Sequence, residues 1–151
     1  MPPEWDNKLR NQTKGAWITI GSYDGVHLGH QTIINQLVEG SHENNKTAVV
    51  INFFPHPVKV LRKIQGPYYL TTQEEKDKIL SSLGIDSLIT IKFDLEFSRQ
   101  NAETFIRLLH EQLQFSSLLI GYDFKFGADR GGDFQTLTEL GNELGYSVKA
   151  I

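Results

Sequence analysis

Two histidines, His27 and His30, stand in a glycine-rich turn at residues 21–30 with the sequence Gly-Ser-Tyr-Asp-Gly-Val-His-Leu-Gly-His. Across the start of a helix, this spacing lets both imidazole rings point to the same side and donate N–H groups to phosphate oxygens. The free N–H groups of a helix N-terminus favour an anion, and Gly29 lets a phosphate come close to the backbone. The turn therefore predicts a triphosphate clamp that neutralises charge rather than supplying a nucleophile.

Other interpretations of these histidines are weaker. A histidine near a helix start is often only a cap or a packed side chain, and the turn could be purely structural. His27 and His30 with His56 could suggest zinc, but no acidic or thiol ligand stands at a matching spacing, and the glycines would be unexplained. A dinucleotide-binding site is disfavoured because the turn lacks the Gly-x-Gly-x-x-Gly pattern.

The composition of the 151 residues limits the classes of function. The chain has no cysteine, which excludes disulfides and thiolate metal sites and favours a cytoplasmic location. Its 15 basic and 18 acidic residues give a net charge of −3 and are dispersed, so nucleic acid is not an expected partner. No apolar run approaches the roughly 20 residues needed to span a bilayer, and residues 1–15 form a polar N-terminal extension. These features predict a soluble protein.

Apolar segments alternate with amphipathic ones along residues 16–151, which predicts one domain. Glycines and capping residues such as Thr71, Thr72 and Asn101 mark the helix ends. We expect strands at residues 16–20, 47–54, 87–91, 117–121 and 146–151, and helices at residues 31–39, 71–83, 101–113 and 133–144. Such alternation predicts an α/β fold, a Rossmann-like, doubly wound parallel sheet of about five strands with helices on both faces. In such sheets ligands bind beyond the carboxyl ends of the strands, where the histidine turn would lie.

The residues of this turn resemble the His-x-Gly-His signature of the nucleotidyltransferase superfamily. More narrowly, residues 20–30 are similar to the form found in the FMN adenylyltransferase module of bacterial FAD synthetases, the bifunctional riboflavin kinase/FMN adenylyltransferases, with Tyr23 in place of the usual phenylalanine. Two further segments resemble that family: Phe-Phe-Pro-His-Pro at residues 53–57, and residues 120–127 with Arg130 and Asp133. The three segments together favour the flavin branch over other nucleotidyltransferases.

The resemblance implies transfer of AMP from ATP to FMN, with Mg²⁺ assisting, to give FAD and pyrophosphate. His27 and His30 would be the catalytic donors to the ATP phosphates. The implied ATP-binding residues are Gly21, Ser22, Tyr23, Asp24 and Gly29. Asp24 could cap the turn, contact a hydroxyl or help hold magnesium, and the sequence leaves these roles open.

The same resemblance places the flavin beyond the second and fourth strands. The implied flavin-binding residues are Pro55, His56, Pro57, Arg62, Asp123, Phe124, Phe126 and Arg130. Several of them could have a simpler role instead. The prolines could only stop a strand, Arg62 could be a solvated side chain, and Phe124 and Phe126 could pack in the core. The loop around Lys125 and Arg130 could be a flap over the phosphates or only a loop.

The family also carries a second ATP motif of the Ser-Ser-Thr-x-x-Arg kind and a C-terminal riboflavin kinase module. Neither is found in residues 1–151. We therefore expect residues 16–151 to be a nucleotidyltransferase domain truncated before its second ATP motif. The expected partners are the small molecules ATP and FMN. The alternatives are a related enzyme with a different phosphorylated acceptor, and a nucleotide- or flavin-binding module without turnover.

Overall fold

The structure is a computed structural model that describes residues 14–21, 28–54, 73–121 and 132–151. Its centre is a sheet of five parallel strands in the order β3-β2-β1-β4-β5. The strands are β1 (Trp17–Gly21), β2 (Ala48–Phe54), β3 (Ser87–Lys92), β4 (Ser117–Ile120) and β5 (Ser147–Ala150). The predicted doubly wound parallel sheet is confirmed.

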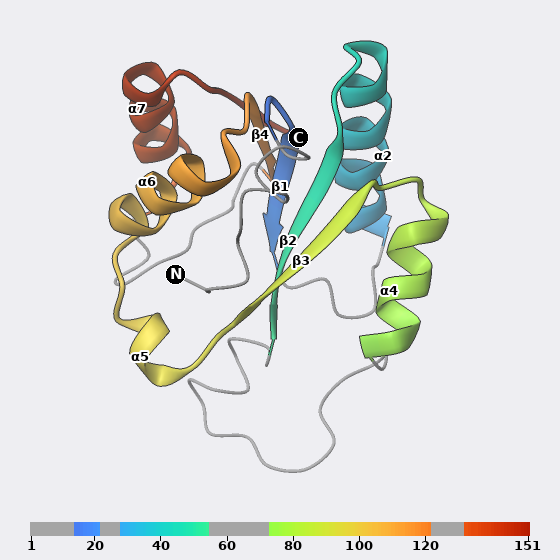
Figure 1. The fold of residues 1–151 in the computed structure, drawn as a ribbon, viewed down its shortest axis with the longest axis horizontal. Helices are drawn as coiled ribbons and strands as arrows, with labels where there is room; N and C mark the ends of the chain where they lie inside the picture. Colours follow the sequence, from blue (N-terminus) through green and yellow to red (C-terminus); the bar gives the residue numbers. More distant parts are fainter. Residues whose placement is uncertain (1–13, 22–27, 55–72, 122–131) are drawn as a thin grey trace.

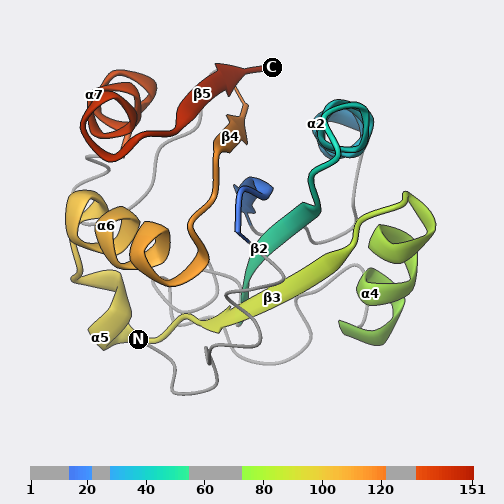
Figure 2. The same ribbon diagram turned by 45° about the horizontal axis from the view of Figure 1, so that its top comes forward.

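Helices cover both faces of this sheet. They are α2 (Leu28–Glu43), α4 (Gln73–Ser82), α5 (Leu95–Ser98), α6 (Ala102–Leu113) and α7 (Phe134–Leu144). Figures 1 and 2 show α2 and α4 on one face and α5, α6 and α7 on the other. The chain moves outward from β1 to β3 and then returns to the other side of β1 for β4. This reversal carries the later helices to the opposite face and places a switch point between β1 and β4.

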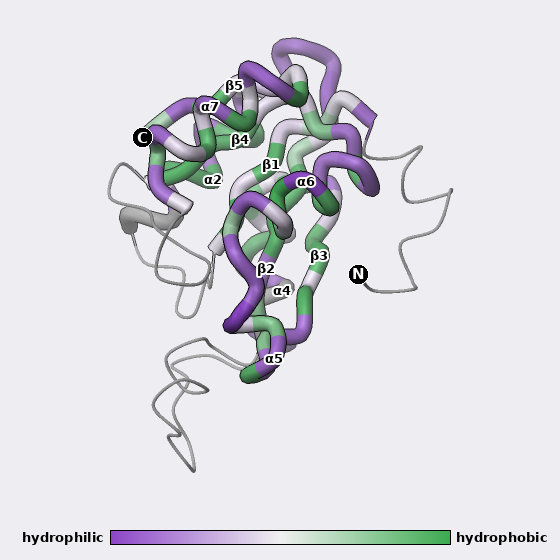
Figure 3. Tube along the Cα trace, turned by 90° about the vertical axis from the view of Figure 1, so that its left-hand side faces the viewer, coloured by the Kyte–Doolittle hydropathy of each residue, from purple (hydrophilic) through white to green (hydrophobic). Residues whose placement is uncertain are grey.

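Two apolar layers hold the helices to the sheet. Between the sheet and α6 and α7, the layer includes Ile18, Ile51 and Leu109, and between the sheet and α2 and α4 it includes Leu37 and Val50. All five are fully buried. The strands contribute alternate residues to the two layers, as a sheet covered on both faces requires. Figure 3 shows hydrophobic residues concentrated along the central strands.

Helix α2 is longer at both ends than the sequence predicted. It begins at Leu28 rather than residue 31, and it continues through Gly40, where helical periodicity alone predicted its end. Gly40 is needed there because a Cβ atom at this position would stand 2.3 Å from Cζ3 of Trp17. The contact depends on a strand residue far away in the sequence, so periodicity could not reveal it.

Short polar residues cap the helices on the α6 side of the sheet. The carboxylate or amide oxygens of Asp94, Asn101 and Asp133 accept hydrogen bonds from backbone N–H groups in the first turns of α5, α6 and α7. Helix α7 ends at Gly145, whose φ of 96° is left-handed backbone that favours glycine. The sequence predicted the start of α6 from Asn101 and the end of α7 from Gly145, but it missed the cap at Asp133 and the single turn of α5.

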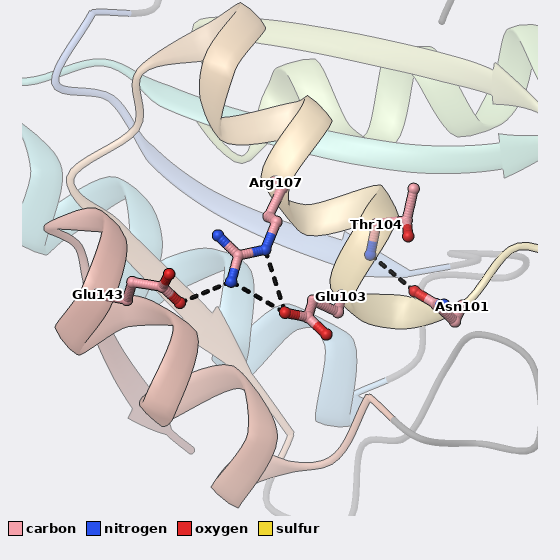
Figure 4. Close-up of polar contacts among 5 residues, drawn as sticks. All are labelled: Asn101, Glu103, Thr104, Arg107 and Glu143. Carbon is pink, nitrogen blue, oxygen red and sulfur yellow. Dashed lines mark hydrogen bonds and ion pairs between the residues drawn. The ribbon is translucent and has the colours of Figure 1, made fainter.

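An exposed ion-pair network joins α6 to α7. Nη2 of Arg107 lies 2.9 Å from Oε1 of Glu103 on the same helix and 2.6 Å from Oε2 of Glu143 on α7 (Figure 4). The hydrogen bonds to Glu143 and then to Glu103 raise the pKa of Arg107 above its usual value. Because solvent screens exposed pairs, the network orients the two helices more than it stabilises the fold. Of the helices that the structure describes, none is both long and apolar enough to cross a membrane.

Candidate functional site

The carboxyl ends of three neighbouring strands form the candidate site. Strand β1 ends at Gly21, β2 at Phe54 and β4 at Ile120, and each of the three sequence segments singled out above lies at one of these ends. Gly21 is paired in register with Asn52 of β2, and β4 runs parallel to β1 on its other side. Parallel strands end at a common edge, the lower edge in Figure 1, where β3 leads into α5. The fold therefore brings to one edge the three strand ends from which these motifs, far apart in the sequence, continue.

Only a few of the predicted site residues lie in the part of the chain that the structure describes. Gly21 is half-buried at the end of β1, and Gly29 and His30 lie in the first turn of α2. The prediction that this part of the motif opens a helix is confirmed. The other predicted residues lie outside the described part of the chain: Ser22, Tyr23, Asp24, His27, Pro55, His56, Pro57, Arg62, Asp123, Phe124, Phe126 and Arg130.

Helix α2 provides the electrostatic part of the site. Its backbone N–H groups are directed toward its N-terminus, and the 16 residues of the helix give this end a partial positive charge. Because α2 packs against β1, β2 and β4, its N-terminus is held beside the end of the central strand. A phosphate group at this edge would meet free N–H donors in a fixed direction.

Four phenylalanines pack together at the same edge on the α6 face. Phe53 of β2 is 5% exposed, and its ring centroid lies 5.9 Å from that of Phe93, 5.7 Å from that of Phe97 and 6.0 Å from that of Phe105. Tilted and edge-to-face contacts of this kind add to the energy of burial. This aromatic quartet fixes the end of β2 directly before Pro55. Phe53, which the family resemblance included in a flavin motif, is thus a core residue.

Two polar residues near this edge have roles that sequence reasoning did not assign. Asn52 is a polar residue in the otherwise almost entirely apolar strand β2, and it is fully buried there. Asp133 belongs to the third motif, and its Oδ1 accepts a hydrogen bond of 2.9 Å from the backbone N–H of Thr136, which makes it the N-cap of α7. The sequence does contain a signal that could have drawn attention to Asn52, because it is the one amide side chain in an apolar strand.

A cavity of about 620 Å³ lies at the opposite edge of the sheet. Its lining includes Lys14, Lys46, His110, Gln114 and Gly145. Helices α6 and α7 both end there, and the partial negative charge of helix C-termini opposes a bound anion. This cavity is therefore a poor place for a triphosphate despite its two lysines. Within the described ranges, no cluster of three or more His, Cys, Asp or Glu residues could hold a metal ion.

His110 beside this cavity should make stability depend on pH. Its ring packs edge-on against Phe115, with centroids 5.0 Å apart, and burial lowers the pKa of His110, although a backbone hydrogen bond at Phe115 opposes the shift. The unfolded chain then binds a proton more readily than the folded chain, so stability is lost as the pH falls below the usual histidine value of about 6.5. We expect the melting temperature of the parent to fall more between pH 7 and pH 5 than that of His110→Gln. Equal slopes would show that the His110 proton is not linked to folding.

The doubly wound sheet, its switch point and a helix N-terminus at the carboxyl edge are typical of the class of α/β domains that bind ligands beyond the carboxyl ends of their strands. The chain belongs to the FAD synthetase family, whose sequence model matches residues 9–151. This match covers every described strand and helix, so the narrower resemblance carried by the three motifs is confirmed.

Named relatives agree with this family. The chain is 36% identical over 136 residues to the bifunctional riboflavin kinase/FMN adenylyltransferase of Escherichia coli (strain K12), covering 89% of this chain and 44% of that protein. It is 36% identical over 146 residues to the protein of the same name from Buchnera aphidicola subsp. Schizaphis graminum, covering 96% and 47%. A FAD synthetase from Listeria monocytogenes is 34% identical over 140 residues, covering 92% and 56%. The chain thus spans about half the length of these relatives.

A solved structure shares the fold. The crystal structure of a macrolide-efflux protein from Streptococcus pneumoniae superposes with a TM-score of 0.75 at 22% identity, covering 91% of this chain and 46% of that one. At this level of identity the similarity establishes the fold alone. It supports the α/β architecture independently of the sequence motifs.

Proposed function

We propose that this domain transfers AMP from ATP to FMN, forming FAD and releasing pyrophosphate. The observation that carries the proposal is the position of the family's motif: it starts at Gly21, at the carboxyl end of the central strand, and continues into the first turn of α2. This is where a doubly wound sheet binds a nucleotide. The choice of reaction is supported by the names of two relatives, which are called FMN adenylyltransferase and FAD synthetase.

In the proposed reaction, a phosphate oxygen of FMN attacks the α-phosphorus of ATP. A new P–O bond forms there, the bond from the α-phosphorus to its bridging oxygen breaks, and pyrophosphate leaves with the electron pair. The attacking group is already an anion, so positioning and charge neutralisation matter more than a base. His27 and His30 would donate hydrogen bonds to the triphosphate that strengthen as charge moves onto pyrophosphate. The N-terminus of α2 would add its partial positive charge.

Magnesium enters this proposal as part of the substrate MgATP. An ion bound to the triphosphate neutralises the oxygens that pyrophosphate carries away. Asp24 is the acidic residue of the motif that could contribute to holding it. Activity should therefore disappear when EDTA is added in excess over Mg²⁺ and return when Mg²⁺ is restored.

The flavin would bind at the ends of β2 and β4, the two strands that flank β1. Pro55, His56 and Pro57 directly follow β2, and Asp123 and Phe124 follow β4 closely. Arg62, Phe126 and Arg130 complete the proposed set. The aromatic quartet supports this assignment because it fixes the position from which the first of these segments departs.

The decisive experiment incubates the full natural chain with MgATP and FMN and separates the products by chromatography. FAD and pyrophosphate should form in equal amounts. A parallel titration follows the fluorescence of FMN as protein is added, with nicotinate mononucleotide and phosphopantetheine as competing acceptors. FMN should bind with quenching or enhancement of its emission, and the competitors should not displace it.

Each alternative has its own outcome in these assays. Binding of FMN without formation of FAD would indicate a binding module, and adenylylation of another acceptor would indicate a different nucleotidyltransferase. Failure to bind FMN would overturn the flavin assignment itself.

We extend the proposal to the longer protein by analogy with its bifunctional relatives. Because the chain spans about half of their length, a riboflavin kinase module is expected to accompany it in the full-length protein. Such a module would supply FMN next to the site that consumes it. A cytoplasmic location remains a prediction from the cysteine-free sequence.

A further inference from the structure

The cavity of about 620 Å³ at the amino edge of the sheet is built from the turns that lead into the central strands. Lys14 and Gly15 precede β1, Lys46 precedes β2, and Gln114 and Ser116 lie between α6 and β4. Two hydrogen bonds tie these turns together. The backbone N–H of Gly15 donates to the carbonyl of Gln114 at 2.7 Å, and Oγ of Ser116 donates to the carbonyl of Gly15 at 2.6 Å. The cavity is thus a fixed part of the fold, and its volume suits a small molecule.

Aromatic rings form the apolar side of this cavity. The ring centroid of Phe115, which is 1% exposed, lies 5.0 Å from that of His110 and 4.8 Å from that of Tyr146. Phe115 and His110 line the cavity together with Leu144 of α7. Burial lowers the pKa of His110, against an opposing backbone hydrogen bond at Phe115, so the imidazole is uncharged at neutral pH. This side of the cavity therefore offers apolar contact without a charge.

Charges of both signs surround the apolar side. Lys14 and Lys46 line the cavity, and Nζ of Lys46 lies 3.0 Å from the position that a Cβ atom on Gly15 would take. Glu111 of α6 supplies a carboxylate, and the C-terminal ends of α6 and α7 add partial negative charge. Within the described part of the chain, these two lysines and this glutamate form no ion pair. An anion would meet the glutamate and the helix ends, and a cation would meet the lysines, so a ligand that carries both charges fits best.

Gln114 gives an independent reason to expect a ligand here. It ends α6 in the left-handed conformation, with φ 52° and ψ 43°, where the backbone favours glycine. At the corresponding position after α7, the chain has the favoured residue, Gly145, which also lines the cavity. Among the described residues, the side-chain amide of Gln114 has no hydrogen-bond partner. A side chain that is kept at a cost in stability, beside a cavity, is explained by contact with a ligand.

We propose that this cavity binds a small zwitterion of the α-amino acid type with an aromatic or apolar side chain. Lys14 and Lys46 bind its carboxylate, and Glu111 and the carbonyl groups at the two helix ends bind its ammonium group. Its side chain packs against Phe115, and Gln114 donates or accepts a further hydrogen bond. The site lies at the edge opposite to the strand ends of the proposed active site, and its occupation needs neither ATP nor FMN.

Three probes with the same ring test the requirement for both charges. They are phenylalanine, 3-phenylpropionate, which lacks the ammonium group, and 2-phenylethylamine, which lacks the carboxylate. In titrations of the full natural chain followed by NMR, phenylalanine should bind with a Kd of about 1 mM or lower. Each singly charged probe should bind at least about 10-fold more weakly, because one charged side of the cavity is left without a partner. No saturable binding of phenylalanine up to about 20 mM, or equal binding of 3-phenylpropionate, would overturn the proposal.

Lys46→Met and Lys149→Met form a matched pair that locates the site. Methionine removes the charge of Lys46 and keeps an unbranched side chain, whereas Lys149 of β5 is exposed and does not line the cavity. We expect Lys46→Met to weaken the binding of phenylalanine about 10-fold and Lys149→Met to leave it within about twofold. Equal losses in the two variants, or no loss in Lys46→Met, would contradict the assignment.

Gln114→Gly separates a ligand contact from a structural role. Glycine relieves the left-handed backbone, so the melting temperature should rise, while the affinity for phenylalanine should fall at least about threefold. Asn45→Gly is the control, because Asn45 is also left-handed, with φ 59°, and precedes Lys46 without lining the cavity. Its affinity for phenylalanine should stay within about twofold of the parent. A Gln114→Gly variant that binds phenylalanine as tightly as the parent would contradict the proposal.

These measurements are independent of the proposed reaction. Saturating FMN and MgATP should not displace phenylalanine from the parent, and displacement would place the probe in the other site and overturn the proposal. A parent that makes no FAD but binds phenylalanine as described would contradict the proposed reaction and support the amino-edge site.

Discussion

Replacing His27 with alanine should lower kcat for FAD formation about 10²- to 10³-fold, and His30→Ala should have an effect of the same size. Removing one donor from a site that stabilises developing negative charge typically costs this much. The KM for FMN should change little because the histidines are assigned to the triphosphate. Steady-state formation of FAD, followed by chromatography at saturating MgATP, measures both quantities. In the double variant, kcat should fall by less than the product of the two single reductions, since both histidines act on the same triphosphate.

His42 provides a matched control on the same helix. It lies in the last turn of α2, and its Nε2 is 2.8 Å from Oδ2 of Asp86, an exposed pair of modest expected energy. His42→Ala should leave kcat within about twofold of the parent. Comparable losses in His42→Ala and His27→Ala would mean that the assay reports damage to α2 and not chemistry at its N-terminus.

Phe105→Ala should destabilise the fold by about 3–5 kcal/mol, the usual cost of removing a buried phenylalanine side chain. Phe105 is 1% exposed, and its ring lies 5.3 Å from that of Phe97 and 6.0 Å from that of Phe53. The cavity would open inside the aromatic quartet that fixes the end of β2. Urea unfolding followed by circular dichroism gives the change in the free energy of unfolding.

Phe134→Ala is the matched control for this loss. Phe134 opens α7 with 42% of its side chain exposed, so the same truncation removes much less buried surface. We expect a loss of under about 1 kcal/mol. Similar losses in the two variants would contradict the assignment of the quartet as a core cluster.

Local signals in the sequence were sufficient for most of the secondary structure. The nearly continuous apolar run of β2 predicted a strand buried on both faces, and Asn101 and Gly145 predicted a helix start and a helix end that the structure contains. These signals work because strand periodicity, capping and left-handed backbone depend on neighbours within a few residues. The alternation of strands and helices then restricted the fold to a doubly wound sheet.

The features that depend on contacts between residues far apart in the sequence were not predicted. The helix α2 was predicted to end before Gly40, because no residue near Gly40 in the sequence shows that the Trp17 ring occupies the space where a side chain would be. The strand ending at Phe54 was predicted from a nearly continuous apolar run, and no role was assigned to Asn52, which the structure shows to be fully buried. The family resemblance grouped Asp133 with a loop motif, whereas the hydrogen bond that it accepts from the backbone N–H of Thr136 shows it to be a helix cap.

The sequence by itself determined the chemistry that this protein can offer: a histidine pair with glycines, two further motifs and the family to which they belong. Residue types and short spacings carry that information. Only the tertiary structure decided that the three strands that lead into these motifs are direct neighbours, with β1 between β2 and β4. That order is set by pairing and packing between segments far apart in the chain, such as Gly21 with Asn52. No local pattern encodes such contacts, so the juxtaposition on which the proposed catalysis depends could be found only in the fold.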